Sequence, residues 1–122
     1  MKNSPETQCR PFPEFVDERG SLVVWEHANL PFNPCRTFMI SNVPQDKIRG
    51  NHAVDCDLFI TAVKGSVVLA FEQLQEILLN KKSDGFHVEK NTFFYLKNFT
   101  DDAIVLVFAE KPHHSTTYKT AK

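Results

Sequence analysis

Short runs of β-branched and aromatic residues fill the chain, and glycine, proline, asparagine or aspartate interrupts them about every ten residues. Residues of the first kind fit a pleated strand, and residues of the second kind fit turns. This pattern predicts an all-β protein, either a sandwich or a jelly roll, and periodicity alone does not choose between the two. The strand candidates are Leu22–Trp25, Thr37–Ile40, Leu58–Val63, Val67–Phe71, Phe86–Val88, Thr92–Leu96 and Ala103–Ala109.

Gly65 stands between two of these runs, Leu58–Val63 and Val67–Phe71. Because glycine readily supplies the positive φ of a tight turn, the sequence predicts a hairpin there. The segment Leu74–Leu79 has apolar residues at helical spacing but is short and lies between strands, so its local pattern is ambiguous. Residues 1–13 hold three of the seven prolines and are predicted to form an extended arm that could pair with a partner chain.

The composition describes one domain spanning residues 1–122, because 122 residues with 42% hydrophobic content suffice for a single core. A net charge of −1 provides no broad cationic surface, so we expect neither nucleic acid nor a membrane as partner. Three widely spaced cysteines without a C-x-x-C pair predict reduced thiols. With a polar N-terminus and no run of about 18 apolar residues, the sequence predicts a cytoplasmic protein.

The segment Arg49-Gly50-Asn51-His52 is the candidate functional motif. Arginine can neutralise an anion, and its planar fork suits a phosphate. Glycine lets the backbone approach a ligand, and histidine is the side chain best suited to moving protons near neutral pH. One interpretation is a site in which His52 acts as acid or base while Arg49 and Gly50 contact a ligand, and the other is a structural histidine that is hydrogen-bonded within a strand.

The order and separation of several motifs resemble those of small cupins that act as 3,4-ketoisomerases on dTDP-4-keto-6-deoxyhexoses, the WxcM-like proteins. The resemblance runs from about Phe15 to Tyr118 and favours a strand for Leu74–Leu79. The motifs that carry it are Asp17-Glu18-Arg19-Gly20-Ser21-Leu22, Glu26, Leu30-Pro31-Phe32, Arg36, Arg49-Gly50-x-His52-Ala53, Gly65-Ser66-Val67, Asp101–Val107 and Thr117-Tyr118.

This resemblance implies a cupin-type jelly roll or β-barrel that binds a dTDP-linked keto sugar and forms a homodimer. The implied reaction moves a carbonyl from C4 to C3 through an enediol, in the synthesis of surface-polysaccharide sugars. Such proton transfer needs a base and a donor that stabilises the oxyanion, but neither a metal nor another cofactor. His52 is then the catalytic residue, with Arg36, Arg49 and Gly50 binding the substrate.

Two positions depart from the family's pattern. Where the family has a second histidine after Ala53, this chain has Val54, and a one-residue deletion would have the same effect. Where the family has an aromatic pair that includes tyrosine, this chain has Phe38-Met39. Proton delivery to the second carbon must then come from elsewhere. The candidates are Asp55, Asp57, His87 and Tyr95.

Two alternatives follow from the same residues. The first is a cupin that keeps the pocket and binds a nucleotide sugar, or has a regulatory role, but no longer catalyses a reaction. The missing histidine and the missing tyrosine support it. A metal-dependent cupin could gather His52, Asp57 and His87. We expect His113-His114 to lie at the surface and Cys56 to belong to the core. Arg19 would make either an ion pair or a turn contact.

Overall fold

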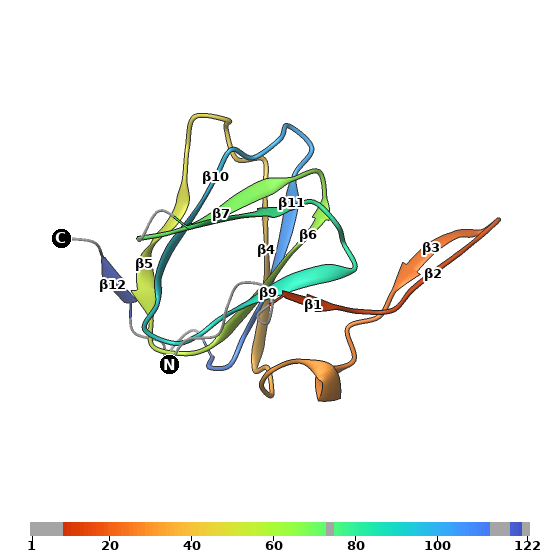
Figure 1. Ribbon diagram of the computed structural model, residues 1–122, viewed down its shortest axis with the longest axis horizontal. Coiled ribbons are helices and arrows are strands. Elements are labelled where there is room, and N and C mark those ends of the chain that lie inside the picture. Colours follow the sequence, from red (N-terminus) through yellow and green to blue (C-terminus); the bar gives the residue numbers. More distant parts are fainter. Residues whose placement is uncertain (1–8, 73–74, 113–117, 121–122) are drawn as a thin grey trace.

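The computed structural model describes residues 9–72, 75–112 and 118–120. Within them, two five-stranded antiparallel sheets face each other and enclose the interior of the molecule (Figure 1). The first sheet has the order β1-β9-β6-β11-β4: β1 (Cys9–Pro11), β9 (Asp84–Val88), β6 (Leu58–Lys64), β11 (Ile104–Ala109) and β4 (Arg36–Ser41). The second has the order β12-β5-β10-β7-β8: β12 (Tyr118–Thr120), β5 (Arg49–Val54), β10 (Phe93–Lys97), β7 (Val67–Phe71) and β8 (Glu76–Leu79).

The core has two parts, and β6 explains why. Successive side chains of a strand point to opposite faces, so Leu58 and Ile60 point between the sheets while Phe59 points outward. On the outer face, Phe12 packs edge-on against Phe59 with ring centroids 5.4 Å apart, and Phe108 lies 6.2 Å from Phe59. Because both faces of β6 are covered, its residues from Leu58 to Ala62 are all buried, Thr61 included, rather than alternately buried and exposed.

The predicted hairpin at Gly65 is wrong. β6 pairs with β11 and β9, whereas β7 pairs with β10 and β8, so the chain crosses from one sheet to the other at this turn. Gly65 does have a positive φ, +64°. A Cβ atom there would approach the Asp102 carboxylate to 2.6 Å and would also collide with the Thr100 hydroxyl. The glycine therefore shapes a tightly packed corner between sheets.

The predictions for Leu74–Leu79 and for the N-terminal arm can be compared with the structure in part. The resemblance assigned a strand to Leu74–Leu79, and β8 (Glu76–Leu79) confirms it for the described part, with Leu74 outside the described residues. The described end of the N-terminal arm lies on its own chain: β1 pairs with β9, and Phe12 is buried. None of the described helical segments has the length and apolarity of a membrane span.

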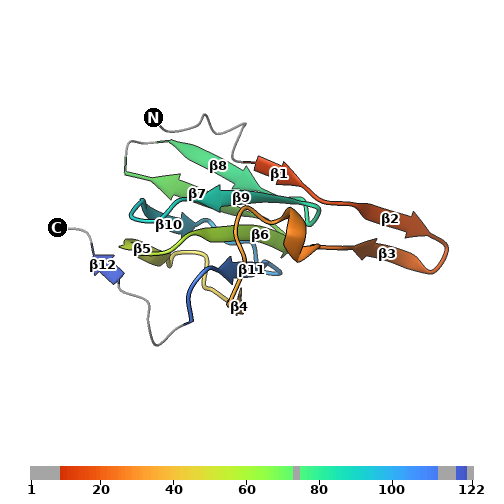
Figure 2. The ribbon, with the colours of Figure 1, turned by 90° about the horizontal axis from the view of Figure 1, so that it is seen from below.

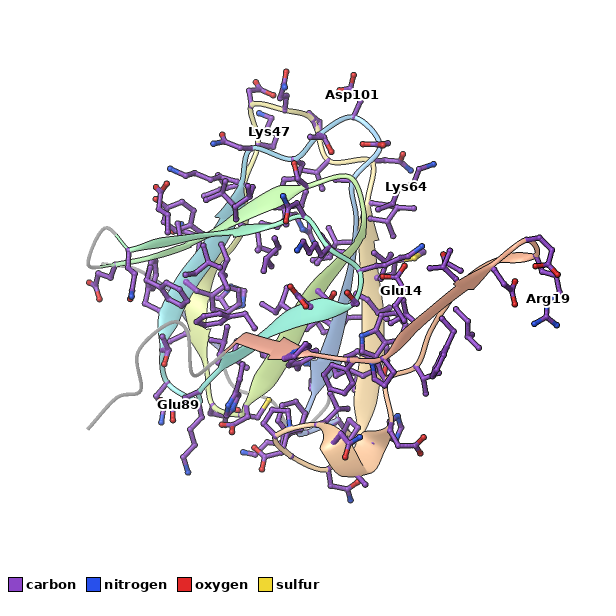
Figure 3. All side chains as sticks on the ribbon, turned by 45° about the vertical axis from the view of Figure 1, so that its right-hand side comes forward. Glu14, Arg19, Lys47, Lys64, Glu89 and Asp101 are labelled. Carbon is purple, nitrogen blue, oxygen red and sulfur yellow. The ribbon has the colours of Figure 1, made fainter. Side chains whose placement is uncertain are left out.

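The element that projects from the body is the hairpin of β2 (Glu14–Asp17) and β3 (Gly20–Val23), seen in Figures 1 and 2. It is followed by the short 3-10 helix η1 (His27–Asn29). At the hairpin tip, labelled Arg19 in Figure 3, the Arg19 guanidinium donates to Asp17 at 2.6 Å. This ion pair is one of the two roles predicted for Arg19. The apolar side chains of Phe15, Val16 and Leu22 remain exposed on the hairpin.

Candidate active site

A β-bulge in β5 turns two functional side chains to the same face. Phe94 of β10 lies opposite His52, the next residue Tyr95 lies opposite Gly50, and Leu96 lies opposite Arg49, so Asn51 is the extra residue. Gly50 and Asn51 have φ angles of +86° and +65°, which glycine and asparagine tolerate best. Without the bulge, strand alternation would turn Arg49 and His52 to opposite faces.

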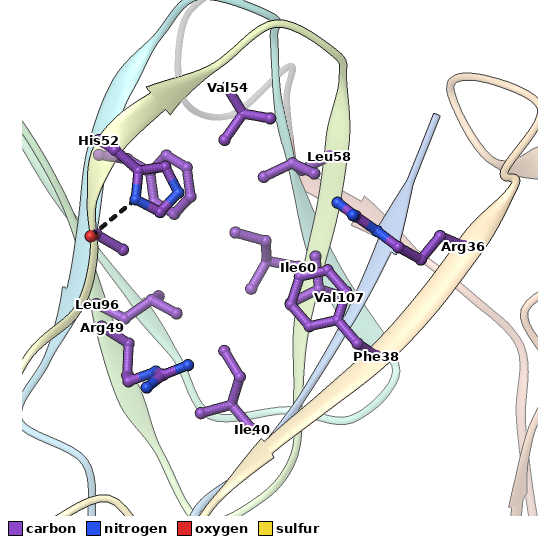
Figure 4. A pocket seen from close by; sticks show the side chains of 12 residues that line it. Arg36, Phe38, Ile40, Arg49, His52, Val54, Leu58, Ile60, Leu96 and Val107 are labelled. Carbon is purple, nitrogen blue, oxygen red and sulfur yellow. Dashed lines mark hydrogen bonds between the residues drawn. The ribbon is translucent and has the colours of Figure 1, made fainter. Parts of the chain in front are cut away.

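The bulge also orients the imidazole of His52. Its Nδ1 lies 2.8 Å from the Gly50 carbonyl oxygen, and because a carbonyl can only accept, Nδ1 carries the hydrogen. In the neutral ring the lone pair is therefore on Nε2, and Figure 4 shows this second nitrogen on the side of the pocket interior. The Phe94 ring packs edge-on against the imidazole at 5.7 Å between centroids. His52 is thus held in the tautomer that a base facing the pocket needs.

His52 faces a cavity of about 170 Å³ between the two sheets. Arg49, Gly50 and His52 line one wall from β5, and Arg36 and Phe38 line the other from β4 (Figure 4). The rest of the lining is apolar: Ile40, Val54, Leu58, Ile60, Phe94, Leu96 and Val107. The structure therefore brings all four predicted site residues to one cavity.

Two cations face this cavity from opposite sheets. The Arg36 guanidinium carbon lies 5.2 Å from the centre of the Phe38 ring, a cation–π contact that helps to orient it. Arg49 comes from the bulged strand, and its side chain also points into the cavity in Figure 4. Phe38 is 37% exposed, so the cavity opens to solvent beside it. An anionic group entering there would meet positive charge from both walls.

The other predicted proton donors lie elsewhere. His87 is on the outer face of the first sheet, where its Nε2 is 2.8 Å from an Asp57 carboxylate oxygen. The other Asp57 oxygen accepts from the Lys90 backbone N–H at 2.9 Å. Asp55 pairs with Lys111 at 3.2 Å. None of these side chains lines the cavity, and Tyr95 does not line it either.

The same geometry separates the three residues of the metal alternative. Asp57 and His87 meet outside the sheet, whereas His52 faces the interior, so they cannot share one ion. Among the side chains that the structure describes, no three of His, Cys, Asp or Glu are grouped as metal ligands. Cys56 is buried in the main core, as predicted. His113-His114 and Thr117 lie outside the described residues.

Sequence reasoning missed the apolar half of the cavity. Phe94, Leu96, Ile60 and Val107 are ordinary inward-facing strand residues, and nothing in their local pattern separates a cavity wall from a packed core. It also missed the carbonyl of Gly50 as the hydrogen-bond partner of His52. The available signal for a bulge was the pair Gly50-Asn51 directly before His52, because glycine and asparagine are the residues that most readily adopt a positive φ.

Two facing antiparallel sheets with a cavity between them define a cupin-type jelly roll. Within that class, the model of the family described as "FdtA: WxcM-like, C-terminal" matches residues 5–121. This match covers nearly the whole chain, so the protein belongs to that family.

Individual relatives agree with this assignment. A TDP-4-oxo-6-deoxy-α-D-glucose-3,4-oxoisomerase of Aneurinibacillus thermoaerophilus is 28% identical over 112 residues, 88% of this chain and 81% of the relative. Among solved structures, a QdtA 3,4-ketoisomerase double mutant from Thermoanaerobacterium thermosaccharolyticum, in complex with TDP, has a TM-score of 0.82. It is 25% identical and covers 86% of this chain and 80% of its own. The WlaRB TDP-quinovose 3,4-ketoisomerase of Campylobacter jejuni has a TM-score of 0.80 and 26% identity, covering 93% and 92%.

Proposed function

We propose that this protein is a 3,4-ketoisomerase of a TDP-linked 4-keto-6-deoxyhexose, acting by proton transfer through an enediol. The observation that carries the proposal is His52, held by the Gly50 carbonyl in the tautomer whose Nε2 lone pair faces the cavity. A relative and two structural neighbours named as 3,4-ketoisomerases support the reaction, and the TDP in one of those structures supports the ligand.

The residues of the cavity suit each step. Nε2 of His52 takes the proton from C3, beside the ketone, and the electron pair moves through the C3–C4 bond to leave negative charge on the C4 oxygen. Arg36 and Arg49 stabilise that enediolate or hold the diphosphate, because a guanidinium is a cation with several N–H donors. A proton then adds at C4, and the proton of the C3 hydroxyl passes to the C4 oxygen, which leaves the new ketone at C3. This sequence needs no metal.

The size of the cavity indicates which part of the ligand enters. About 170 Å³ is well below the roughly 300–1,000 Å³ of pockets that enclose a drug-sized ligand. We therefore place the sugar ring inside and the nucleotide at the open side near Phe38. The apolar walls exclude water around the enediolate and strengthen its attraction to the arginines.

Proton NMR of the protein with dTDP-4-keto-6-deoxyglucose in deuterated water tests the proposal. We expect a 3-keto product, with deuterium at C3 of the substrate and C4 of the product to the extent that the proton held by His52 exchanges with solvent. Exchange at C3 without product would show a competent base whose delivery step is lost. A protein that binds dTDP but gives neither signal would be a binding cupin, and the proposed activity would be refuted.

We also propose a homodimer of a single domain spanning residues 1–122, formed through the β2–β3 hairpin. An isolated two-stranded hairpin is marginally stable in water, and this one exposes Phe15 at 59%, Val16 at 72% and Leu22 at 59%. Apolar side chains gathered on a projecting element are typical of an interface. Sedimentation of the wild type and of a Phe15→Ser/Leu22→Ser variant tests this: a dimer that the double substitution converts to a monomer is expected.

A cytoplasmic location and a role in surface-polysaccharide synthesis stay predictions of the sequence and the resemblance. Fractionation of cells that express the protein measures the location directly.

A further inference from the structure

Among the described residues that line the cavity, an acid–base side chain is present only on the β5 wall. Of its twelve lining residues, His52 is the one of a type that both donates and accepts protons in acid–base catalysis. Arginine does not serve as a base in proteins, which excludes Arg36 and Arg49, and the others are Gly50 and apolar residues. Two acid–base groups on opposite sides of a bound sugar are therefore absent from the described lining.

Val54 occupies the position where a second carrier could have stood on β5. It lies two residues after His52, and alternation turns it to the same face. Its side chain is 3% exposed and packs in the main core. The ionisable groups nearby in the sequence, Asp55 and Asp57, are engaged with Lys111 and His87 outside the cavity. The missing function is thus not restored from a neighbouring described residue.

We infer that His52 acts as a single base that takes the proton from C3 and returns it to C4 on the same face of the sugar ring. This inference rests on the proposed isomerase function. Removal of the C3 proton gives an imidazolium and an enediolate, and the same Nε2–H then protonates C4 while the C3 oxygen becomes the ketone. The proton of the C3 hydroxyl passes to the C4 oxygen, so atoms and electrons balance and His52 is neutral again.

A single base fixes the configuration of the product. In dTDP-4-keto-6-deoxyglucose the C3 hydrogen is axial, on the face opposite to the C3 hydroxyl. A proton delivered to C4 from that same face leaves the C4 hydroxyl axial, which is the galacto configuration. Delivery by a second group from the other face would leave the hydroxyl equatorial, the gluco configuration. The cavity lining therefore predicts a galacto-configured 3-keto product.

The test is proton NMR in ordinary water, where the hydrogen added at C4 is visible, with dTDP-4-keto-6-deoxyglucose and spectra taken early in the conversion. We expect a 3-keto product with a small coupling between H4 and H5, because H4 is then equatorial. A large coupling would show the gluco product and overturn the single-base inference while leaving the isomerase proposal intact. That result would place a donor on the opposite wall, for example from a partner subunit.

A product that is absent altogether would instead refute the proposed function, so the two failures are distinguishable. The Asp55→Asn variant is the matched control, since it removes an acid next to Val54 that faces away from the cavity. We expect it to give the same galacto product at a rate within a few-fold of the wild type. Loss of product in this variant would assign Asp55 a proton-transfer role and overturn the inference.

Discussion

His52 and His87 are both strand histidines with one ring nitrogen in a hydrogen bond 2.8 Å long, yet they occupy opposite environments. His52 faces the cavity between the sheets, is bonded to a backbone carbonyl and shares its space with two arginines. His87 lies outside the first sheet, bonded to the Asp57 carboxylate and close to the Phe32 ring, with centroids 6.1 Å apart.

The difference between these two histidines shows what makes such a residue available for chemistry. The carbonyl partner fixes the tautomer of His52 and leaves the second nitrogen directed at a space that a ligand can enter. The carboxylate partner of His87 makes a local clamp, because Asp57 also accepts from the Lys90 N–H. The outer surface, which also includes the β2–β3 hairpin, therefore offers a matched control for the histidine, arginine and glycine of the cavity.

The largest expected effect is the loss of His52. His52→Asn should lower kcat by about 10²- to 10⁴-fold, the usual contribution of a general base, while the affinity for dTDP stays unchanged. His87→Asn should keep kcat within a few-fold and instead lower the melting temperature, because it breaks the clamp with Asp57. Activity assays and thermal melts of both variants check this. Equal losses of kcat would abolish the distinction between the two faces.

Arginines give the next comparison. Arg36→Gln should weaken dTDP affinity by about ten- to a hundred-fold, since a hydrogen bond to a charged group such as the diphosphate contributes about 1.5–3 kcal/mol. Arg19→Gln, at the exposed hairpin tip, should leave the affinity unchanged. Titration calorimetry with dTDP measures both. Unaltered binding in Arg36→Gln would contradict the assignment of Arg36 to the ligand.

Two glycines with positive φ give a smaller effect. Gly50→Ala should cost about 1–2 kcal/mol of stability from the backbone conformation alone. It should also lower kcat several-fold, because the new Cβ would lie 3.3 Å from the Phe94 ring and shift the bulge that holds His52. At Gly20 no atom lies within 4 Å of such a Cβ. Gly20→Ala should therefore lower only the stability, and denaturant melts with parallel rate assays would show whether both variants lose activity alike.

The smallest expected effect is at Asp17. The Arg19 side chain first, and then the Arg19 backbone N–H, hold the pKa of this carboxyl below its ordinary value. A carboxyl whose pKa is lowered on folding stabilises the fold above its unfolded-state pKa and loses that contribution as the pH falls through the folded value. Asp17→Asn should thus show a slightly smaller drop in melting temperature between pH 7 and pH 3 than the wild type. A larger drop would contradict the sign.

How far the site was predictable differs from residue to residue. Arg49-Gly50-Asn51-His52 is contiguous, so its chemistry could be read directly, and a spacing match added Arg36. Asp57 and His87 were offered as partners of His52 because they are near it in the sequence or could face it. The structure turned them to the other side of the sheet. For Asp57 the reason is that residues 55–57 form the bend between β5 and β6 rather than a strand, so alternation from His52 does not continue through them. His87 lies on β9 opposite Phe59, whose side chain points outward.

The sequence by itself determined the all-β class, the location of most strands, the positive φ at Gly65 and the identity of the groups able to move a proton. These depend on side-chain sterics and turn propensity, which act within a few residues. The tertiary structure decided that β6 and β7 belong to different sheets, that β6 is covered on both faces, and that the bulge turns Arg49 and His52 into one cavity. Those outcomes depend on which distant strands pair and which apolar faces are buried together, and local periodicity carries no information about either.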